Sequence, residues 1–316
     1  MPTQHDSVLQ EELIKYINLK KGDFAIDATL GGGGHTSALV EKVGEKGLVI
    51  AIDQDSDAIE QFNINNKNKY KNIILINDNF SNLQFIINRI FEKKKAPRFN
   101  GIVFDLGLSS DQLADRNRGF SFQSDGSLKM NFDPNAPEKN TAGYILNNYS
   151  LKQLIDIFQK FGEEPFSKKI AQAIIEYRVN KKIISTSQLA GIIEATMKMR
   201  DRKKVHPATK VFQALRIAVN DELCRLNKAL PQAVELLEKG GRIAVISFHS
   251  LEDRIVKNYF KIESKGCLCP PNFPVCQCTH KAKLKLITTK PVIASDIEIQ
   301  TNIRSRSAKM RIAEKI

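Results

Sequence analysis

The chain has 316 residues, of which 42% are hydrophobic and 26% are charged, so it is long enough to bury one large core or two ordinary ones. Its 48 lysines and arginines exceed its 35 aspartates and glutamates, and the net charge of +13 favours a polyanionic partner such as a nucleic acid. No apolar run approaches the roughly 18 residues of a membrane span, and the first residues do not resemble a secretion signal. The five cysteines are an odd number, which favours reduced thiols over a framework of disulfides. We therefore expect a folded, soluble, cytoplasmic protein rather than a secreted, disordered or membrane-spanning one.

Short runs of β-branched and apolar residues alternate with helical patterns in the first third of the chain, and one more run occurs near residue 245. These runs are 24–26, 48–52, 73–76, 102–104 and 243–246. Continuous apolar runs of this length are typical of parallel strands that are buried on both faces. The pattern predicts a doubly wound α/β sheet.

The interval between the fourth and fifth runs is far longer than the roughly 30 residues of a βαβ crossover. It contains no strand-like run, and it shows two convincing helical patterns, one over 164–178 and one that starts at Pro207. The second pattern carries an apolar stripe that we expect to be core: Phe212, Leu215, Val219 and Leu226. The interval therefore predicts an inserted all-helical domain.

Four consecutive glycines, Gly31 to Gly34, stand where the first strand must turn into a helix. Glycine tolerates the φ values of such a turn and lets a ligand approach the backbone closely. The second strand ends at Asp53, about 20 positions beyond Gly33, and a carboxylate at this spacing can accept hydrogen bonds from the ribose hydroxyls of an adenosine. Together these residues predict a site for a nucleoside cofactor.

Three further residues indicate which cofactor this is. Thr36 stands where dinucleotide sites prefer a third glycine. Asp27 before the glycines and Asp105 after the fourth strand would attract the cationic methionine end of S-adenosyl-L-methionine and repel a pyrophosphate. S-adenosyl-L-methionine is therefore the favoured cofactor, although Asp27 can equally be a structural acceptor for the glycine loop.

Several blocks of sequence are too long and too particular to follow from a generic need of the fold. They are 105–112, 118–122, 125–126, 162–164, 206–209 with 212–214, 240–242, 247–254 and 304–308. These blocks span nearly the whole chain and resemble the ribosomal RNA small subunit methyltransferase H family. The resemblance implies a Rossmann-like class I S-adenosylmethionine-dependent methyltransferase core over 1–110 and 222–316, with an inserted helical substrate-recognition domain over 111–221.

The activity that this resemblance implies is transfer of a methyl group to the exocyclic N4 of a cytidine in the decoding (P-site) region of 16S rRNA. The implied partner is 16S rRNA, naked or within the small ribosomal subunit, and the sequence leaves the oligomeric state open. By motif match the implied cofactor contacts are Gly33, Gly34, His35, Asp53, Phe80, Asp105 and Gln112. A non-catalytic RNA-binding assembly factor on the same scaffold is the alternative, and a methyltransferase for small molecules is a third possibility.

The reacting centre is expected at the carboxyl edge of the sheet, where doubly wound folds bind substrates. An exocyclic amine is a poor nucleophile, so it must be held in line with the methyl group while its N–H hydrogens are accepted. We predict Asp105 as this acceptor, with Ser109 in the same segment and with His249 and Ser250 after the fifth strand. His249 has a second interpretation, because a histidine that caps the following helix beside Glu252 would give the same sequence.

Two features limit the transfer of substrate contacts from the resemblance. Ser127, Lys129 and Asn131 depart from the residues usual in the family, which leaves the contacts of their loop open. The basic stretches 198–210 and 281–316 could follow RNA phosphates or could be solvated faces.

Four cysteines, Cys267, Cys269, Cys276 and Cys278, form a cluster in the sequence, and His280 follows closely. Such a cluster could bind zinc, but the spacing is CxC rather than the CxxC of common zinc sites. The sequence therefore favours reduced, partly buried loop thiols, and we predict no metal among the site residues.

Overall fold

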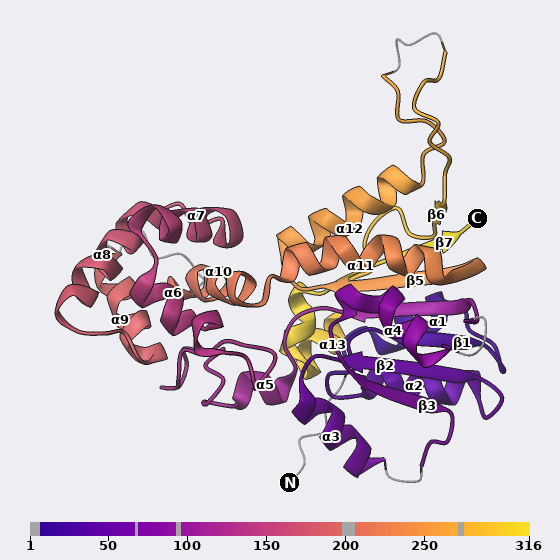
Figure 1. The fold of residues 1–316 in the computed structure, drawn as a ribbon, viewed down its shortest axis with the longest axis horizontal. Coiled ribbons are helices and arrows are strands. Elements are labelled where there is room, and N and C mark those ends of the chain that lie inside the picture. Colours follow the sequence, from indigo (N-terminus) through magenta and orange to yellow (C-terminus); the bar gives the residue numbers. More distant parts are fainter. Residues whose placement is uncertain (1–6, 67–68, 93–95, 198–205, 271–274) are drawn as a thin grey trace. The chain divides into compact units, whose positions relative to one another are not determined.

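The computed structural model describes residues 7–66, 69–92, 96–197, 206–270 and 275–316. The chain divides into two compact units. Unit 1 comprises Met1–Gly107 with Leu223–Ile316, and unit 2 is the continuous segment Leu108–Glu222. The second unit thus interrupts the first between its fourth and fifth strands (Figure 1).

Unit 1 is built on a sheet which, in the part of the chain that the structure describes, has seven strands in the order β3-β2-β1-β4-β5-β7-β6. Its strands are β1 (Phe24–Asp27), β2 (Leu48–Asp53), β3 (Ile73–Asn77), β4 (Phe99–Asp105), β5 (Leu237–Ser247), β6 (Leu284–Leu286) and β7 (Lys309–Lys315). Its helices are α1 (Gln10–Ile17), α2 (Gly34–Val43), α3 (Ser56–Asn65), η1 (Phe80–Asn82), α4 (Leu83–Ile90), α11 (Glu222–Leu236), α12 (Ser250–Glu263), α13 (Asp296–Thr301) and η4 (Ile303–Ser307). The strands β1 to β5 pair in parallel, while β7 runs antiparallel to both β5 and β6.

Helices cover both faces of this sheet, as the alternation of side chains along β4 shows. Ile102 and Phe104 belong to the core cluster that contains α4, α11 and α12. Val103 between them belongs to the cluster on the other face, which contains α1 and α2. Because successive side chains of a strand point to opposite faces, an uninterrupted apolar run is required here.

The doubly wound α/β fold that the sequence predicts is confirmed, and each of the five apolar runs lies within one of the parallel strands. The strands β6 and β7 were not predicted. Within the basic stretch 281–316, not every basic side chain can face RNA or solvent, and the role of the others stays a prediction. In particular, the Arg311 side chain is buried, and its Nε and Nη2 donate to the Asp253 carboxylate at 2.6 and 3.1 Å.

Unit 2 is helical, with its own hydrophobic core. Its elements are α5 (Ser110–Ala114), η2 (Glu138–Asn140), α6 (Ala142–Asn148), α7 (Leu151–Gly162), α8 (Ser167–Asn180), α9 (Thr186–Thr196) and α10 (Ala208–Asn220). The two predicted helices correspond to α8 and α10, and Pro207 stands at the N-cap of α10.

The predicted apolar stripe on the second of these helices is wrong at its far end. The helix α10 ends at Asn220, and Asp221 has a φ of 50°, in the left-handed region. Phe212 and Leu215 lie in the core of unit 2, whereas Leu226 belongs to α11 and packs in the core of unit 1. The apolar spacing therefore continues in the sequence past the end of α10, although the turn there places Leu226 in a different helix and a different core.

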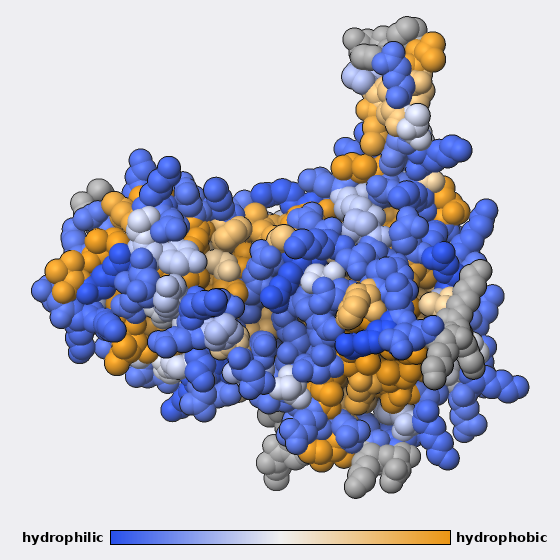
Figure 2. Space-filling view, in the orientation of Figure 1, coloured by the Kyte–Doolittle hydropathy of each residue, from blue (hydrophilic) through white to orange (hydrophobic). Residues whose placement is uncertain are grey.

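In the described part of the chain, the structure contains no helix that is both long enough and apolar enough to cross a membrane. The surface seen in Figure 2 is largely hydrophilic on both units. Most of the stretch 198–210 lies outside the described residues.

Candidate active site

The glycine elbow, Gly31 to Gly34, joins the end of β1 to the start of α2. Gly33 is the N-cap of α2 and has a φ of 79°, in the left-handed region. A Cβ atom on Gly33 would lie only 2.1 Å from the ring of Phe62, which packs against the elbow. Glycine is therefore required at this position by both conformation and space.

Asp27, at the end of β1, hydrogen-bonds residues on both sides of the glycine elbow. The carboxylate accepts a hydrogen bond of 2.6 Å from the Thr36 hydroxyl and one of 3.1 Å from the Thr29 amide. The side chain is fully buried, and this burial raises its pKa to about 6 despite these hydrogen bonds. Both oxygens thus bind residues that flank the elbow, which fits the interpretation of Asp27 as a structural acceptor.

Asp53, at the end of β2, also binds the elbow. Its Oδ2 accepts from the Gly31 amide at 2.8 Å, and its Oδ1 accepts from the Asp55 amide at 2.9 Å. Burial raises the pKa of Asp53 to about 6, while the two amide hydrogen bonds oppose the shift. Since each carboxylate oxygen has two lone pairs, the ionised group can still accept hydrogen bonds from a pair of vicinal hydroxyls.

Asp105, at the end of β4, faces the first turn of α2. The Asp105 Oδ2 atom lies 3.4 Å from Nε2 of the buried His35. Burial alone would lower the pKa of His35, but the Asp105 carboxylate, with a smaller contribution from Asp27, raises it above its ordinary value. The Asp105 amide donates to the Thr29 hydroxyl oxygen at 2.7 Å, which fixes the strand end against the elbow.

Two polar atoms of this pair lack a partner. Within the described residues, Asp105 Oδ1 and His35 Nδ1 are buried without a hydrogen bond, and His35 Nε2 has only its 3.4 Å contact with Asp105 Oδ2, which lacks hydrogen-bond geometry. Unsatisfied buried polar groups cost free energy, so each one in a native protein calls for an explanation, such as a water, an ion or a ligand that completes its hydrogen bonding. This end of the sheet is therefore suited to a polar ligand.

Phe80 borders the same edge of the sheet. It begins η1 just after β3, and its ring packs edge-on against Phe104, with the ring centroids 5.7 Å apart. The Asp78 amide donates to the Asp53 carbonyl oxygen at 3.0 Å, which keeps this segment beside the end of β2. A partly buried aromatic ring next to Asp53, the predicted ribose acceptor, suits a nucleobase.

His249 and Ser250 follow β5, where α12 begins. His249 is the N-cap, and its Nδ1 accepts a hydrogen bond of 3.4 Å from the Glu252 amide. The Glu252 carboxylate accepts in return from the His249 amide, and His249 Nε2 lies 3.1 Å from Glu252 Oε1. The capping interpretation of His249 is therefore confirmed, and any contact with a substrate stays a prediction.

Ser109 and Gln112 belong to unit 2. There Ser109 caps α5, because its hydroxyl accepts from the Gln112 amide while the Gln112 side chain accepts from the Ser109 amide. Asn131, one of the departures noted in the sequence, is buried and donates to the Asn140 carbonyl oxygen at 2.7 Å. Its role within unit 2 is thus structural.

The structure places six predicted residues along the carboxyl edge of the parallel strands in unit 1, and their contact with a cofactor stays a prediction. They are Gly33, Gly34, His35, Asp53, Phe80 and Asp105. Sequence reasoning missed the two threonines, Thr29 and Thr36, whose hydroxyls connect the elbow to β4 and to Asp27. The signal for them was present, because hydroxyl residues beside a turn commonly make local hydrogen bonds.

The fold and this edge together define the class of protein. The antiparallel strand β7, between β5 and β6, departs from the all-parallel order of dinucleotide-binding sheets, and Asp53 hydrogen-bonds the glycine elbow at the edge where the cofactor is predicted. This is a Rossmann-like, S-adenosylmethionine-dependent methyltransferase. The chain belongs to the MraW methylase family, whose profile matches residues 2–316.

Relatives with similarity over nearly the whole chain carry the name ribosomal RNA small subunit methyltransferase H. The protein of Halothermothrix orenii is 45% identical over 314 residues, which cover 99% of each chain. That of Thermomicrobium roseum is 46% identical over 316 residues, which cover 100% of this chain and 95% of the relative. That of Dehalococcoides mccartyi strain 195 is 47% identical over 312 residues, which cover 99% and 86% respectively.

Proposed function

We propose that this protein methylates small-subunit ribosomal RNA, and that its target is the exocyclic N4 of a cytidine in the decoding region of 16S rRNA. The names of its relatives support the class of substrate. The net charge of +13 suits a polyanion. The observation that carries the choice of an amine is the buried Asp105 Oδ1, which, within the described residues, has no hydrogen-bond partner.

The residues at the carboxyl edge of the parallel strands fit S-adenosylmethionine. Ionised Asp53 would accept the ribose hydroxyls, Phe80 would contact the adenine, and His35 with Asp105 would lie toward the methionine end. The carboxylates of Asp27 and Asp105 near that end suit a cation. When bound, the cofactor supplies a methyl group on a positively charged sulfur.

Asp105 is the proposed acceptor for the cytosine amine. The lone pair of this amine is delocalised into the ring, so its attack on the methyl carbon needs alignment and removal of positive charge. In this proposal Asp105 Oδ1 accepts one N–H of the amine and holds the nitrogen in line. It receives the proton that the nitrogen loses when the N–C bond forms and the bond between the methyl carbon and the cofactor sulfur breaks. His35 holds the other carboxylate oxygen, Oδ2, at 3.4 Å and so orients the group.

His249 and Ser250 are proposed to border the cytosine at the end of β5. His249 Nδ1 accepts from the Glu252 amide, so we assign the ring a positioning role and no proton transfer. Ser109 stays the proposed residue of the reacting centre and Gln112 the proposed cofactor contact, although the structure shows both as caps of α5. The remainder of unit 2 is proposed to recognise the RNA around the target. The target base must leave any stack to reach the site.

The decisive experiment uses small subunits from a strain that lacks this enzyme. They are incubated with the protein and methyl-labelled S-adenosylmethionine, and the labelled nucleoside is then mapped and identified by mass spectrometry. The same reaction with naked 16S rRNA distinguishes the two forms of the substrate. We expect label on N4 of one cytidine in the decoding region.

The other outcomes each overturn a distinct part of the proposal. Label on another base or atom would refute the assigned target. Binding of RNA and cofactor without any methylation would favour the non-catalytic assembly factor. Methylation of a small molecule with no salt-dependent binding of RNA would reject the nucleic-acid substrate altogether.

A further inference from the structure

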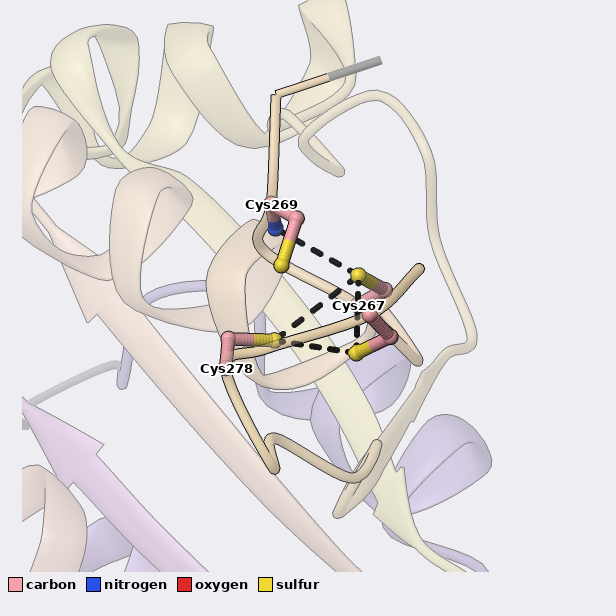
Figure 3. Close-up of side chains that lie close together, drawn as sticks. Cys267, Cys269 and Cys278 are labelled. Carbon is pink, nitrogen blue, oxygen red and sulfur yellow. Dashed lines mark hydrogen bonds between the residues drawn. The ribbon is translucent and has the colours of Figure 1, made fainter. Parts of the chain in front are cut away.

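Four thiols converge in the segment between α12 and β6, away from the methyltransfer site. The sulfur atoms of Cys267, Cys269, Cys276 and Cys278 all lie within 4.8 Å of one another. Three of the six separations are 3.4, 3.7 and 3.6 Å, and they join Cys267 to Cys276, Cys267 to Cys278 and Cys276 to Cys278 (Figure 3). A tetrahedral zinc with Zn–S bonds of about 2.3 Å requires sulfur separations of roughly 3.8 Å. The thiols therefore already outline a coordination tetrahedron.

Backbone amides support these sulfur atoms in a reciprocal pattern. The Leu268 amide, within the first CxC pair, donates to Cys278 Sγ at 3.2 Å. The Gln277 amide, within the second pair, donates to Cys269 Sγ at 3.2 Å. Such N–H···S hydrogen bonds stabilise thiolates, and a metal site needs this kind of support around its ligands. The CxC spacing lets each pair provide an amide for the other.

Packing gives no other reason for the thiols to gather. In 264–270 and 275–283, the described parts of this segment, no side chain is buried. Leu268 and Val275 are 43% and 70% exposed. In Figure 2 the segment stands out from the body of unit 1 with hydrophobic residues on its surface. A short segment without a core needs a cross-link to hold one conformation.

We propose that Cys267, Cys269, Cys276 and Cys278 bind one Zn²⁺ as a closed structural site. Four Zn–S bonds form, and the thiol protons are released to solvent. Thiolates select a soft or borderline cation, and four of them leave no open position for catalysis. His280 is not needed as a ligand, because its Nε2 lies 3.2 Å from the Ile262 carbonyl oxygen. The sequence favoured free thiols because of the CxC spacing, and the convergence of the two pairs reverses that preference.

The metal content of the protein tests this proposal, with the fifth cysteine as a matched control. The chain is purified under reducing conditions, exposed to zinc, passed through a desalting column and analysed for metals. We expect about one zinc per chain. Cys276→Ser and Cys278→Ser should each lose most of the metal. Cys224→Ser should keep it, because Cys224 is an exposed residue of α11 outside the cluster.

Replacement of zinc by Co²⁺ provides a reading that does not depend on the variants folding. A tetrahedral site of four thiolates should give intense visible d–d absorption and sulfur-to-cobalt charge-transfer bands, and zinc should bleach both. Unmodified protein that retains no metal and gives no such spectrum would refute the site. Disulfides among the four cysteines in the reduced, zinc-treated protein, detected by mass spectrometry, would refute it as well.

Discussion

His35 Nε2 lies 3.4 Å from Asp105 Oδ2, although the two residues belong to different βα units of the sheet. The imidazole lies in the first turn of α2 and the carboxylate at the end of β4. The pair therefore connects the glycine elbow to Asp105, the proposed acceptor for the cytosine amine. The His35 side chain is only 4% exposed, whereas that of Asp105 is 25% exposed. The pair thus has one buried member and one member that is partly exposed.

Replacement of Asp105 by asparagine should lower kcat at saturating cofactor by about 10²-fold, because the cytosine amine loses its anionic acceptor. The amide keeps the shape of the side chain, so calorimetry should still detect cofactor binding. The pKa of His35 should fall in the same variant, since the Asp105 carboxylate is what raises it. Imidazole NMR signals followed across pH would report this second effect. Full turnover in the variant would show that Asp105 is not the acceptor.

Cofactor affinity should weaken as pH falls through about 6. The pKa of Asp53 is raised to about 6 in the free protein, and only the ionised carboxylate can accept from both ribose hydroxyls. Binding therefore lowers this pKa, and Kd should rise roughly tenfold for each pH unit below 6 until the pKa of the complex is reached.

Asp53→Asn is the control for this pH dependence. Its affinity at neutral pH should be lower and its pH dependence shallower. Calorimetric titrations at several pH values measure both curves. An Asp53→Asn variant with the same slope as the unchanged protein would assign the titration to another group.

The sequence was most informative where structure follows from local rules. The parallel strands were predictable, because burial on both faces demands continuous apolar runs such as 48–52. The strand β7 was not, because its charged Arg311 is tolerated in the sheet only through Asp253, a partner 58 positions away. A pattern along the chain contains no information on such a distant pairing.

The same distinction holds within the candidate site. The strand ends at Asp53 and Asp105 could be placed at one edge of the sheet from topology alone. The link from the Thr29 hydroxyl to the Asp105 amide could not, because it depends on the path of the elbow. His249 was left with two interpretations, since a cap and a substrate contact require the same residue at the same helix start.

Gly33→Ala should destabilise the protein more than Gly22→Ala does. Both glycines have φ in the left-handed region, at 79° and 92°, so both variants suffer a similar backbone cost of about 1 kcal/mol. A Cβ on Gly22 would meet no atom within 4 Å, whereas one on Gly33 would overlap the Phe62 ring. We expect a further loss of about 1–3 kcal/mol in the free energy of unfolding for Gly33→Ala. Denaturant unfolding measures the difference, and Phe62→Leu in the Gly33→Ala background should recover part of it. Equal losses in the two single variants would show that the ring yields without cost.

A pair of substitutions can separate the two roles of His249, the cap of α12 and the proposed positioning of the cytosine. His249→Ala removes the side-chain cap of α12 and should lower the free energy of unfolding by about 1 kcal/mol. Asparagine is among the best N-cap residues, so His249→Asn should restore that stability. If the imidazole also positions the cytosine, the asparagine variant should show a KM for RNA that is several-fold higher with little change in kcat, because positioning is lost while the acceptor Asp105 is intact. Thermal unfolding and steady-state methylation of small subunits supply the two readings. A stable His249→Asn variant with an unchanged KM would limit this histidine to its role as a helix cap.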